Sequence, residues 1–144
     1  MAVPYVFPRR VGWADCDPAG MIYTPRVIDI ATEALECWNR DVLGVSWFDL
    51  NWKLNLGAPM VRVECDFLKI MPCDLELLVE VRVLGLGRAS VTYQMTGRDS
   101  AGDTYFRTTY VACYIDRKDH KSTPVPERFR DAILAYQAAC GDAA

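Results

Sequence analysis

The sequence predicts an α+β fold in which an antiparallel sheet is covered on one face by one long helix. Apolar residues recur at helical spacing between Pro25 and about Leu43. Four later segments alternate apolar and polar residues, as half-buried strands do, and short turn sequences separate them. With a first strand at residues 5–13 and a terminal helix from about Pro126, we expect a five-stranded sheet, one long helix and a C-terminal helix in one domain spanning residues 1–144.

The long helix is predicted to begin at Pro25, because proline is well tolerated at the first helical position, and to end before Gly44. Its apolar positions share one face, which is broad enough to lie across a sheet: Val27, Ala31, Ala34, Leu35, Trp38 and Val42. Residues 45–60 show no clear period and predict a short helical turn and a loop.

The four later strands are expected near residues 61–68, 75–83, 91–96 and 105–115. The connections at 71–74, 85–87 and 100–103 carry turn residues, so neighbouring strands should form antiparallel hairpins. The last strand is apolar on both sides, which predicts a central position or an interface and argues for a dimer. The terminal helix is expected to turn four side chains inward: Phe129, Ile133, Leu134 and Tyr136.

Composition excludes several classes of function. The hydrophobic content of 51% excludes wholesale disorder, and the net charge of −3 offers no basic surface for nucleic acid. No apolar run reaches 18 residues, so a protein without a membrane span, soluble and cytoplasmic, is expected. The six cysteines form no Cys-x-x-Cys pair and predict buried reduced thiols.

The single histidine narrows the chemistry further. His120 lies in a charged stretch, which predicts a solvated loop residue and excludes Ser-His-Asp and Cys-His nucleophile systems. No spacing of Cys and His suggests a zinc site. The sequence around Gly85 and Gly87 lacks the third glycine of a dinucleotide fingerprint and leads into a strand. No metal or redox cofactor is expected.

Carboxylates remain as candidate catalytic groups, and Asp17 stands on the most constrained loop. Pro18 fixes its own backbone, and Gly20 permits a left-handed turn. Asp17 is predicted to be a nucleophile or general base on a carbonyl; the alternative is a residue that only caps or solvates the turn. The backbone N–H of Thr24, at the start of the helix, could hold an oxyanion. Asp15 is expected to be structural.

This segment also carries a family resemblance. The run Asp15-Cys16-Asp17-Pro18-Ala19-Gly20, then Tyr23 and Pro25 before a long helix, resembles the entry segment of 4-hydroxybenzoyl-CoA thioesterase-like proteins of the hotdog fold. The likeness extends more loosely over residues 5–116. It implies a sheet that wraps the long helix and pairs with a second copy, as a homodimer or homotetramer. It also implies a catalytic aspartate at Asp17 and coenzyme A as part of the substrate.

The resemblance suggests further binding residues. Arg88 and Ser90 match a region that contributes to the coenzyme A path in similar thioesterases, while four other cations are candidates on charge alone: Arg62, Lys118, Lys121 and Arg128. Gly20 shapes the catalytic loop, and Tyr23 is expected to pack or to line the acyl pocket. Trp47, Pro59 and Met60 suggest an apolar acyl group, aromatic or medium-chain.

One departure from the family pattern concerns the acyl pocket. Similar proteins often carry Asp or Glu at the position of Thr32, whereas here the carboxylate is Glu33, about 100 degrees further around the helix. Recognition of a 4-hydroxyl group on a benzoyl ring is therefore not implied.

The sequence predicts an acyl-CoA thioesterase that releases a carboxylic acid and coenzyme A. Two alternatives stay open. One is a thioesterase acting on acyl carrier protein, whose active-site mouth would prefer an acidic protein partner. The other is a non-catalytic acyl-thioester binding protein, in which Asp17 only shapes the loop.

Overall fold

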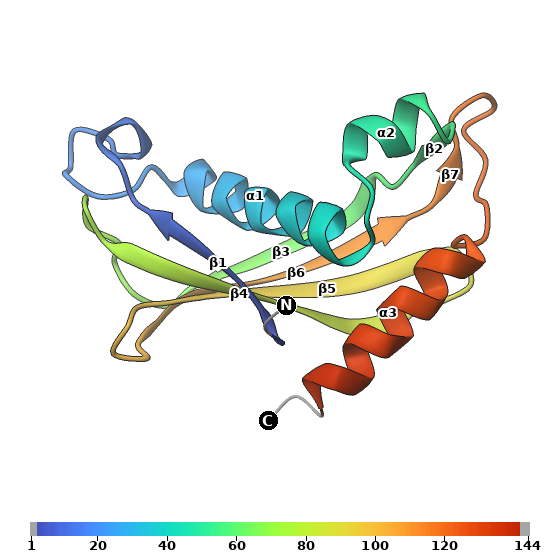
Figure 1. Ribbon diagram of the computed structural model, residues 1–144. Coiled ribbons are helices and arrows are strands. Elements are labelled where there is room, and N and C mark those ends of the chain that lie inside the picture. Colours follow the sequence, from blue (N-terminus) through green and yellow to red (C-terminus); the bar gives the residue numbers. More distant parts are fainter. Residues whose placement is uncertain (1–2, 142–144) are drawn as a thin grey trace.

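A computed structural model describes residues 3–141, and it contains a five-stranded antiparallel sheet that curves beneath the long helix α1 (Thr24–Val42) (Figure 1). The strand order is β1 (Tyr5–Arg10), β4 (Glu76–Leu86), β5 (Ser90–Arg98), β6 (Thr104–Cys113) and β3 (Met60–Phe67). The predicted α+β class, with one helix across a five-stranded antiparallel sheet, is confirmed.

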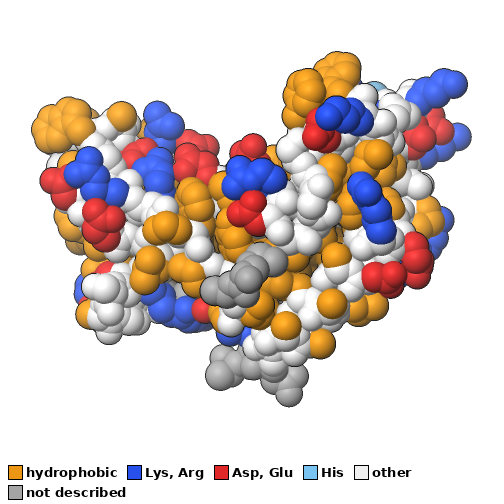
Figure 2. Space-filling view, viewed as in Figure 1, with side chains coloured by type: hydrophobic (Ala, Val, Ile, Leu, Met, Phe, Trp, Pro, Cys, Tyr) orange, Lys and Arg blue, Asp and Glu red, His pale blue; other side chains and the backbone are white. Residues whose placement is uncertain are grey.

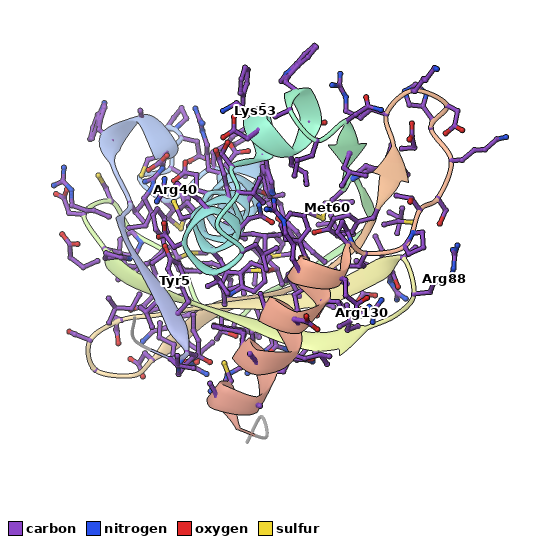
Figure 3. The ribbon with its side chains drawn as sticks, turned by 45° about the vertical axis from the view of Figure 1, so that its right-hand side comes forward. Tyr5, Arg40, Lys53, Met60, Arg88 and Arg130 are labelled. Carbon is purple, nitrogen blue, oxygen red and sulfur yellow. The ribbon has the colours of Figure 1, made fainter. Side chains whose placement is uncertain are left out.

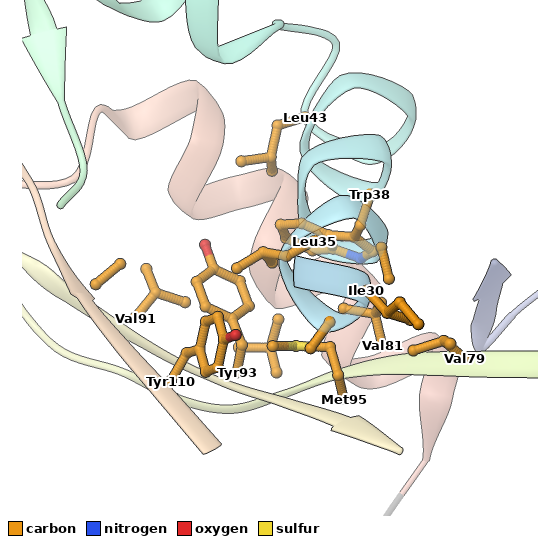
Figure 4. Packing of buried hydrophobic residues seen from close by; sticks show 14 of the residues in the cluster. Ile30, Leu35, Trp38, Leu43, Val79, Val81, Val91, Tyr93, Met95 and Tyr110 are labelled. Carbon is orange, nitrogen blue, oxygen red and sulfur yellow. The ribbon is translucent and has the colours of Figure 1, made fainter. Parts of the chain in front are cut away.

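Helix α1 lies on the sheet through one apolar face, as its spacing predicts. Trp38 is fully buried near its C-terminal end and packs edge-on against Tyr93 of β5, at 5.3 Å between ring centroids. The second contact of Trp38 is Tyr136 of α3 (Glu127–Cys140), at 5.4 Å. Figure 4 shows Trp38 and Leu35 above Tyr93 and Met95 in this core. Trp38 therefore holds α1, β5 and α3 together.

The route of the chain between β3 and β4 differs from the prediction. Strand β3 pairs with β6 and not with β4, so residues 68–75 cross the end of the sheet. The hairpin expected at residues 71–74 is therefore wrong, because alternation identifies a strand but does not select its partner. The β4–β5 and β5–β6 hairpins are confirmed. We call residues 68–75 the crossover segment.

Strand β6 lies inside the sheet, as predicted, whereas β3 forms one edge. On β3, Val63 and Phe67 stand opposite the buried residues Tyr110 and Phe106 of β6, yet they are 45% and 52% exposed. The residues that alternate with them are charged: Arg62, Glu64 and Asp66. The core-facing side of this edge is therefore apolar and uncovered.

Two further helices cover the ends of the core. The predicted short helical turn is α2 (Trp47–Trp52), which is followed by a two-stranded sheet of β2 (Leu56–Gly57) and β7 (Ile115–Asp116). In α3, three of the four predicted side chains are buried, but Leu134 is 50% exposed. That expectation is wrong because the next residue on a helix is rotated by about 100 degrees from its neighbour Ile133. Within residues 3–141, no helix is long and apolar enough to cross a membrane.

The first strand is also shorter than expected. β1 ends at Arg10, because residues 13–15 turn into the short helix η1 (Trp13–Asp15). β1 occupies the edge of the sheet opposite β3. It delivers the chain to the loop that contains Asp17.

Candidate functional site

The loop that carries Asp17 is held by three backbone interactions. Cys16 and Ile22 form an antiparallel bridge, the N–H of Asp17 donates to Met21 O at 3.0 Å, and the N–H of Gly20 donates to Asp17 O at 3.0 Å. Gly20 has φ +79°, the left-handed conformation that glycine adopts without strain. The crossover segment adds a fourth contact, because Met71 O accepts the N–H of Ile22 at 2.9 Å. The loop thus has one defined shape.

The Asp17 side chain is half-buried, and its two oxygens have different surroundings. Oδ1 accepts the backbone N–H of Ala19 at 2.9 Å, which is the turn-shaping role of the alternative interpretation. Within the described chain, Oδ2 has no hydrogen-bond partner. Asp17 borders a cavity of about 480 Å³, the Asp17 cavity, whose other lining residues are Trp13, Cys16, Pro18, Gly20 and Cys73. One carboxylate oxygen therefore remains available to a ligand.

Asp15 is a structural residue, as expected. It is 6% exposed, and it accepts hydrogen bonds from Arg9 Nη1 at 2.6 Å and from the N–H of Gly12 at 2.8 Å. The hydrogen bonds from Arg9 hold the pKa of the Asp15 carboxyl below its usual range. Arg9 also binds Glu33 of α1 at 3.0 Å. Glu33 is therefore engaged with Arg9 and does not line the cavity that Thr32 borders.

The start of α1 is free of side-chain caps. Tyr23 is the N-cap residue and makes no capping hydrogen bond, while its own N–H donates to Asp15 O at 2.8 Å. Tyr23 is 55% exposed, so the packing expected for its ring does not occur within this chain. Thr24 borders a cavity of about 340 Å³, the Thr24 cavity, together with Met21, Ile22, Val27 and residues 67–71. An uncapped helix N-terminus attracts anions through its free N–H groups.

A third cavity of about 410 Å³ lies between α2 and Thr32 in the middle of α1, and we call it the α2 cavity. Trp47, Pro59 and Met60, the three predicted acyl-binding residues, all line it. Its wall is mainly apolar, and its volume falls in the range of about 300–1,000 Å³ found for small-ligand sites. The structure thus brings these three residues together, although they lie on separate elements.

The α2 cavity also has polar groups, which are Thr32, Asn51, Arg117 and His120. Thr32 Oγ1 lies 3.1 Å from the hydroxyl of the buried Tyr110, and both hydroxyls contact Ile28 O. His120 is exposed, as predicted, but it stands at the cavity border.

Sequence reasoning pointed to position 32 but missed Arg117. This guanidinium donates to Asn51 O at 2.6 Å and lies over the Trp52 ring at 4.2 Å. No local motif marks such a contact, since it joins two distant segments.

Arg88 and Ser90 lie outside the α2 cavity, on the β4–β5 hairpin. The N–H of Gly87 donates to Ser90 O at 2.8 Å, which closes the turn. In Figure 3, Arg88 extends from the hairpin away from Met60. The hairpin is nevertheless joined to the cavity wall, because Ala89 O accepts the N–H of Tyr114, the neighbour of the lining residue Ile115. Arg88 therefore lies at the same end of the molecule as the α2 cavity.

The predicted residues thus form two separate groups, one near the start of α1 and one near α2 and the β4–β5 hairpin (Figure 1). Asp17 and Thr24 lie at the start of α1, and even there they border different cavities. Thr32 of the α2 cavity is eight residues further along the helix, or about 12 Å. Exposed apolar side chains stand at both upper corners in Figure 2, and the aromatic side chains exposed over η1 and α2 are Trp13, Phe48 and Trp52. A single chain does not unite the two groups.

The described residues contain no cluster of three or more His, Cys, Asp or Glu side chains that could hold a metal ion.

Comparison with known proteins gives the family. Residues 11–133 match the model of the thioesterase-like superfamily. A 1,4-dihydroxy-2-naphthoyl-CoA hydrolase of Synechocystis sp. is 26% identical over 134 residues, which cover 90% of this chain and 94% of the relative. The corresponding hydrolase of Synechococcus elongatus is 28% identical over 132 residues, with 88% and 93% covered.

A crystal structure of a thioesterase superfamily protein from Jannaschia sp. matches with a TM-score of 0.86 at 29% identity, covering 94% of each chain. These matches confirm the predicted hotdog fold and the predicted class, a thioester hydrolase. The chain belongs to the thioesterase-like superfamily.

Proposed function

We propose that this protein is an acyl-CoA thioesterase acting on an aromatic acyl group, with Asp17 as its catalytic carboxylate. The observation that carries the proposal is the partner-free oxygen of Asp17, on a rigid loop beside the uncapped start of α1. The similar hydrolases named for 1,4-dihydroxy-2-naphthoyl-CoA support an aromatic substrate. The mainly apolar α2 cavity supports the same class of acyl group.

The active site is completed by a second copy of the chain. The uncovered apolar side chains of β3 favour antiparallel pairing with the β3 strand of another copy, which would remove an exposed sheet edge. Such pairing brings Met60 of one copy close to Phe67 of the other. Met60 borders the α2 cavity, and Phe67 borders the Thr24 cavity. The acyl cavity of one copy therefore opens towards the helix start of the other.

In this arrangement the thioester carbonyl lies between Asp17 and the N–H of Thr24. Asp17 either attacks the carbonyl carbon, which releases coenzyme A and leaves an anhydride that water hydrolyses, or it removes a proton from a water that attacks directly. Both routes consume one water and release an acid and coenzyme A. The N–H of Thr24 and the helix dipole stabilise the oxyanion, and one such donor contributes about 3 kcal/mol.

The polar groups of the α2 cavity suggest how the acyl group is recognised. Thr32 and Tyr110 place two neutral hydroxyls side by side, 3.1 Å apart. Thr32 lines the cavity and its hydroxyl can accept from a hydroxyl on an aromatic ring, while the buried Tyr110 hydroxyl supports it from behind. A neutral hydroxyl thus stands where similar proteins carry a carboxylate. The coenzyme A part of the bound substrate would extend out of the cavity towards Arg117 and Arg88, whose guanidinium groups suit its phosphates.

One observation favours a second candidate role for Asp17, in which it only shapes the loop and another group catalyses hydrolysis. The hydrogen bond from Ala19 to Asp17 shapes the loop without any chemistry. Under this alternative, loss of the Asp17 charge would change loop stability and leave hydrolysis unaffected.

The test is a panel of aromatic and medium-chain acyl-CoA substrates, with free thiol measured on release. Asp17→Asn should lower kcat by about 10²–10⁴-fold, the range of a lost general base. The matched control is Asp74→Asn, an exposed aspartate on the adjacent crossover segment, which should hydrolyse like the wild type. If Asp17→Asn hydrolyses every substrate at the wild-type rate, Asp17 only shapes the loop and the protein uses another catalytic group.

A further inference from the structure

Two cysteines from distant parts of the sequence border the cavity beside Asp17. Cys16 directly precedes Asp17, and Cys73 lies in the crossover segment. Both are half-buried and unpaired, and both line the Asp17 cavity. The sequence predicted buried thiols, but all six cysteines are only half-buried.

The backbone explains why these two thiols meet. Residues 21–22 form a short extended segment, which is bridged to Cys16 through Ile22 on one side and to Pro72 through Met21 on the other. Cys73 follows Pro72, so its side chain reaches the same cavity. Burial and the nearby Cys73 side chain raise the pKa of the Cys16 thiol. The two thiols therefore face one cavity from opposite sides of residues 21–22.

We propose that Cys16 and Cys73 are a modification site, which a small disulfide such as oxidised glutathione converts into an intramolecular disulfide bond. The Cys73 thiolate attacks one sulfur of oxidised glutathione, forms a mixed disulfide and releases one glutathione thiolate. Cys16 then loses its proton to water and attacks the Cys73 sulfur, which releases the second glutathione. Two protein thiols are oxidised, and one external disulfide is reduced to two thiols.

The order of attack follows from the local chemistry. The raised pKa of Cys16 keeps it protonated, which favours Cys73 as the first attacker. Cys16 Sγ also donates to Gly12 O at 3.5 Å, a contact that it must give up to turn towards Cys73. The second step is thus the slower one.

The new bond would change access to Asp17. It ties the catalytic loop to the crossover segment and places two linked sulfur atoms in the Asp17 cavity. Hydrolysis should therefore fall when the disulfide forms and return when a reductant breaks it.

The experiment treats the purified protein with oxidised glutathione and measures mass and activity in the same samples. The intact mass should fall by about 2 Da, for the two hydrogens lost in one disulfide. Trypsin should yield the peptide of residues 11–26 linked to the peptide of residues 70–82. Activity should fall at least tenfold and recover with dithiothreitol. Mass is read without any substrate, so failure of the proposed function would not hide the result.

Two variants make the test specific, each compared with its own untreated sample. Cys73→Ser should keep its activity under oxidised glutathione. Cys140→Ser, at the end of α3, should respond like the wild type. Glutathione adducts without a Cys16–Cys73 link would overturn the proposal. It would also be overturned by a link that leaves activity intact, or by equal inactivation of Cys73→Ser.

Discussion

The start of α1 and the region around its middle differ in their chemistry. At the N-terminal end, uncapped N–H groups follow a loop with a half-buried carboxylate, and an ion pair between Arg9 and the buried Asp15 holds that loop. Near the middle of the helix, an apolar cavity is lined by Thr32, whose hydroxyl contacts the buried hydroxyl of Tyr110. The first region suits bond breaking, and the second suits recognition of an acyl group. The difference teaches that one chain holds the two parts of the proposed site at separate places, which supports the proposal that a second copy joins them.

The largest effect is expected from the edge that would join the copies. Val63→Asp places a charge on the apolar side of β3 and should convert the dimer to monomers, since a buried unpaired charge is strongly unfavourable. Activity should fall more than about 100-fold, which equals about 2.7 kcal/mol. Analytical ultracentrifugation and thiol release measure the two effects. Glu64→Gln, on the charged side of the same strand, is the control and should stay dimeric and active.

The next effect concerns the support of the catalytic end. Asp15→Asn leaves Arg9 without its buried partner and should lower the free energy of unfolding at pH 7 by about 3 kcal/mol. Because the folded protein lowers the pKa of Asp15, this stabilisation is complete above the ordinary pKa near 4 and is lost as the pH falls through the folded value.

Urea unfolding at pH 7 and at low pH checks that prediction. The difference in free energy of unfolding between Asp15→Asn and the wild type should be smaller at low pH than at pH 7. The exposed Arg10–Asp74 pair serves as the control. Asp74→Asn should lower the free energy of unfolding by less than about 1 kcal/mol at either pH. A constant difference for Asp15→Asn at all pH values would contradict the assigned role of its charge.

The smallest effect concerns the recognition end. Thr32→Val removes one hydroxyl of the pair and keeps the shape of the side chain. KM for an acyl-CoA with a ring hydroxyl should rise about tenfold, or about 1.4 kcal/mol, while KM for benzoyl-CoA should stay unchanged. Steady-state kinetics with both substrates provides the comparison. Tyr110→Phe should likewise raise KM for the hydroxylated substrate and leave KM for benzoyl-CoA unchanged. An equal change in KM for both substrates would show that the Thr32–Tyr110 pair only supports the fold.

The sequence predicted the local structure around Asp17 better than that around the α2 cavity, for physical reasons. The Asp17 loop and α1 depend on local chemistry, because a proline, a glycine and a repeating apolar face determine their shapes. The pairing of β3 with β6 depends on contacts between distant segments, which alternation along one strand does not specify.

The α2 cavity shows the same limit. Trp47 and Met60 were identified as acyl-binding candidates by residue type. Arg117 was missed because only the folded chain brings it to Asn51 and Trp52.

Complementation between two inactive variants tests the central claim most directly. Asp17→Asn removes the catalytic carboxylate, and Ala58→Trp fills the α2 cavity. If each site combines Asp17 of one copy with the α2 cavity of the other, a mixed dimer keeps one intact site. An equal mixture, unfolded and refolded together, should then regain about a quarter of wild-type activity, because half of its dimers are mixed. Activity no higher than the mean of the two separate variants would contradict a site shared between copies.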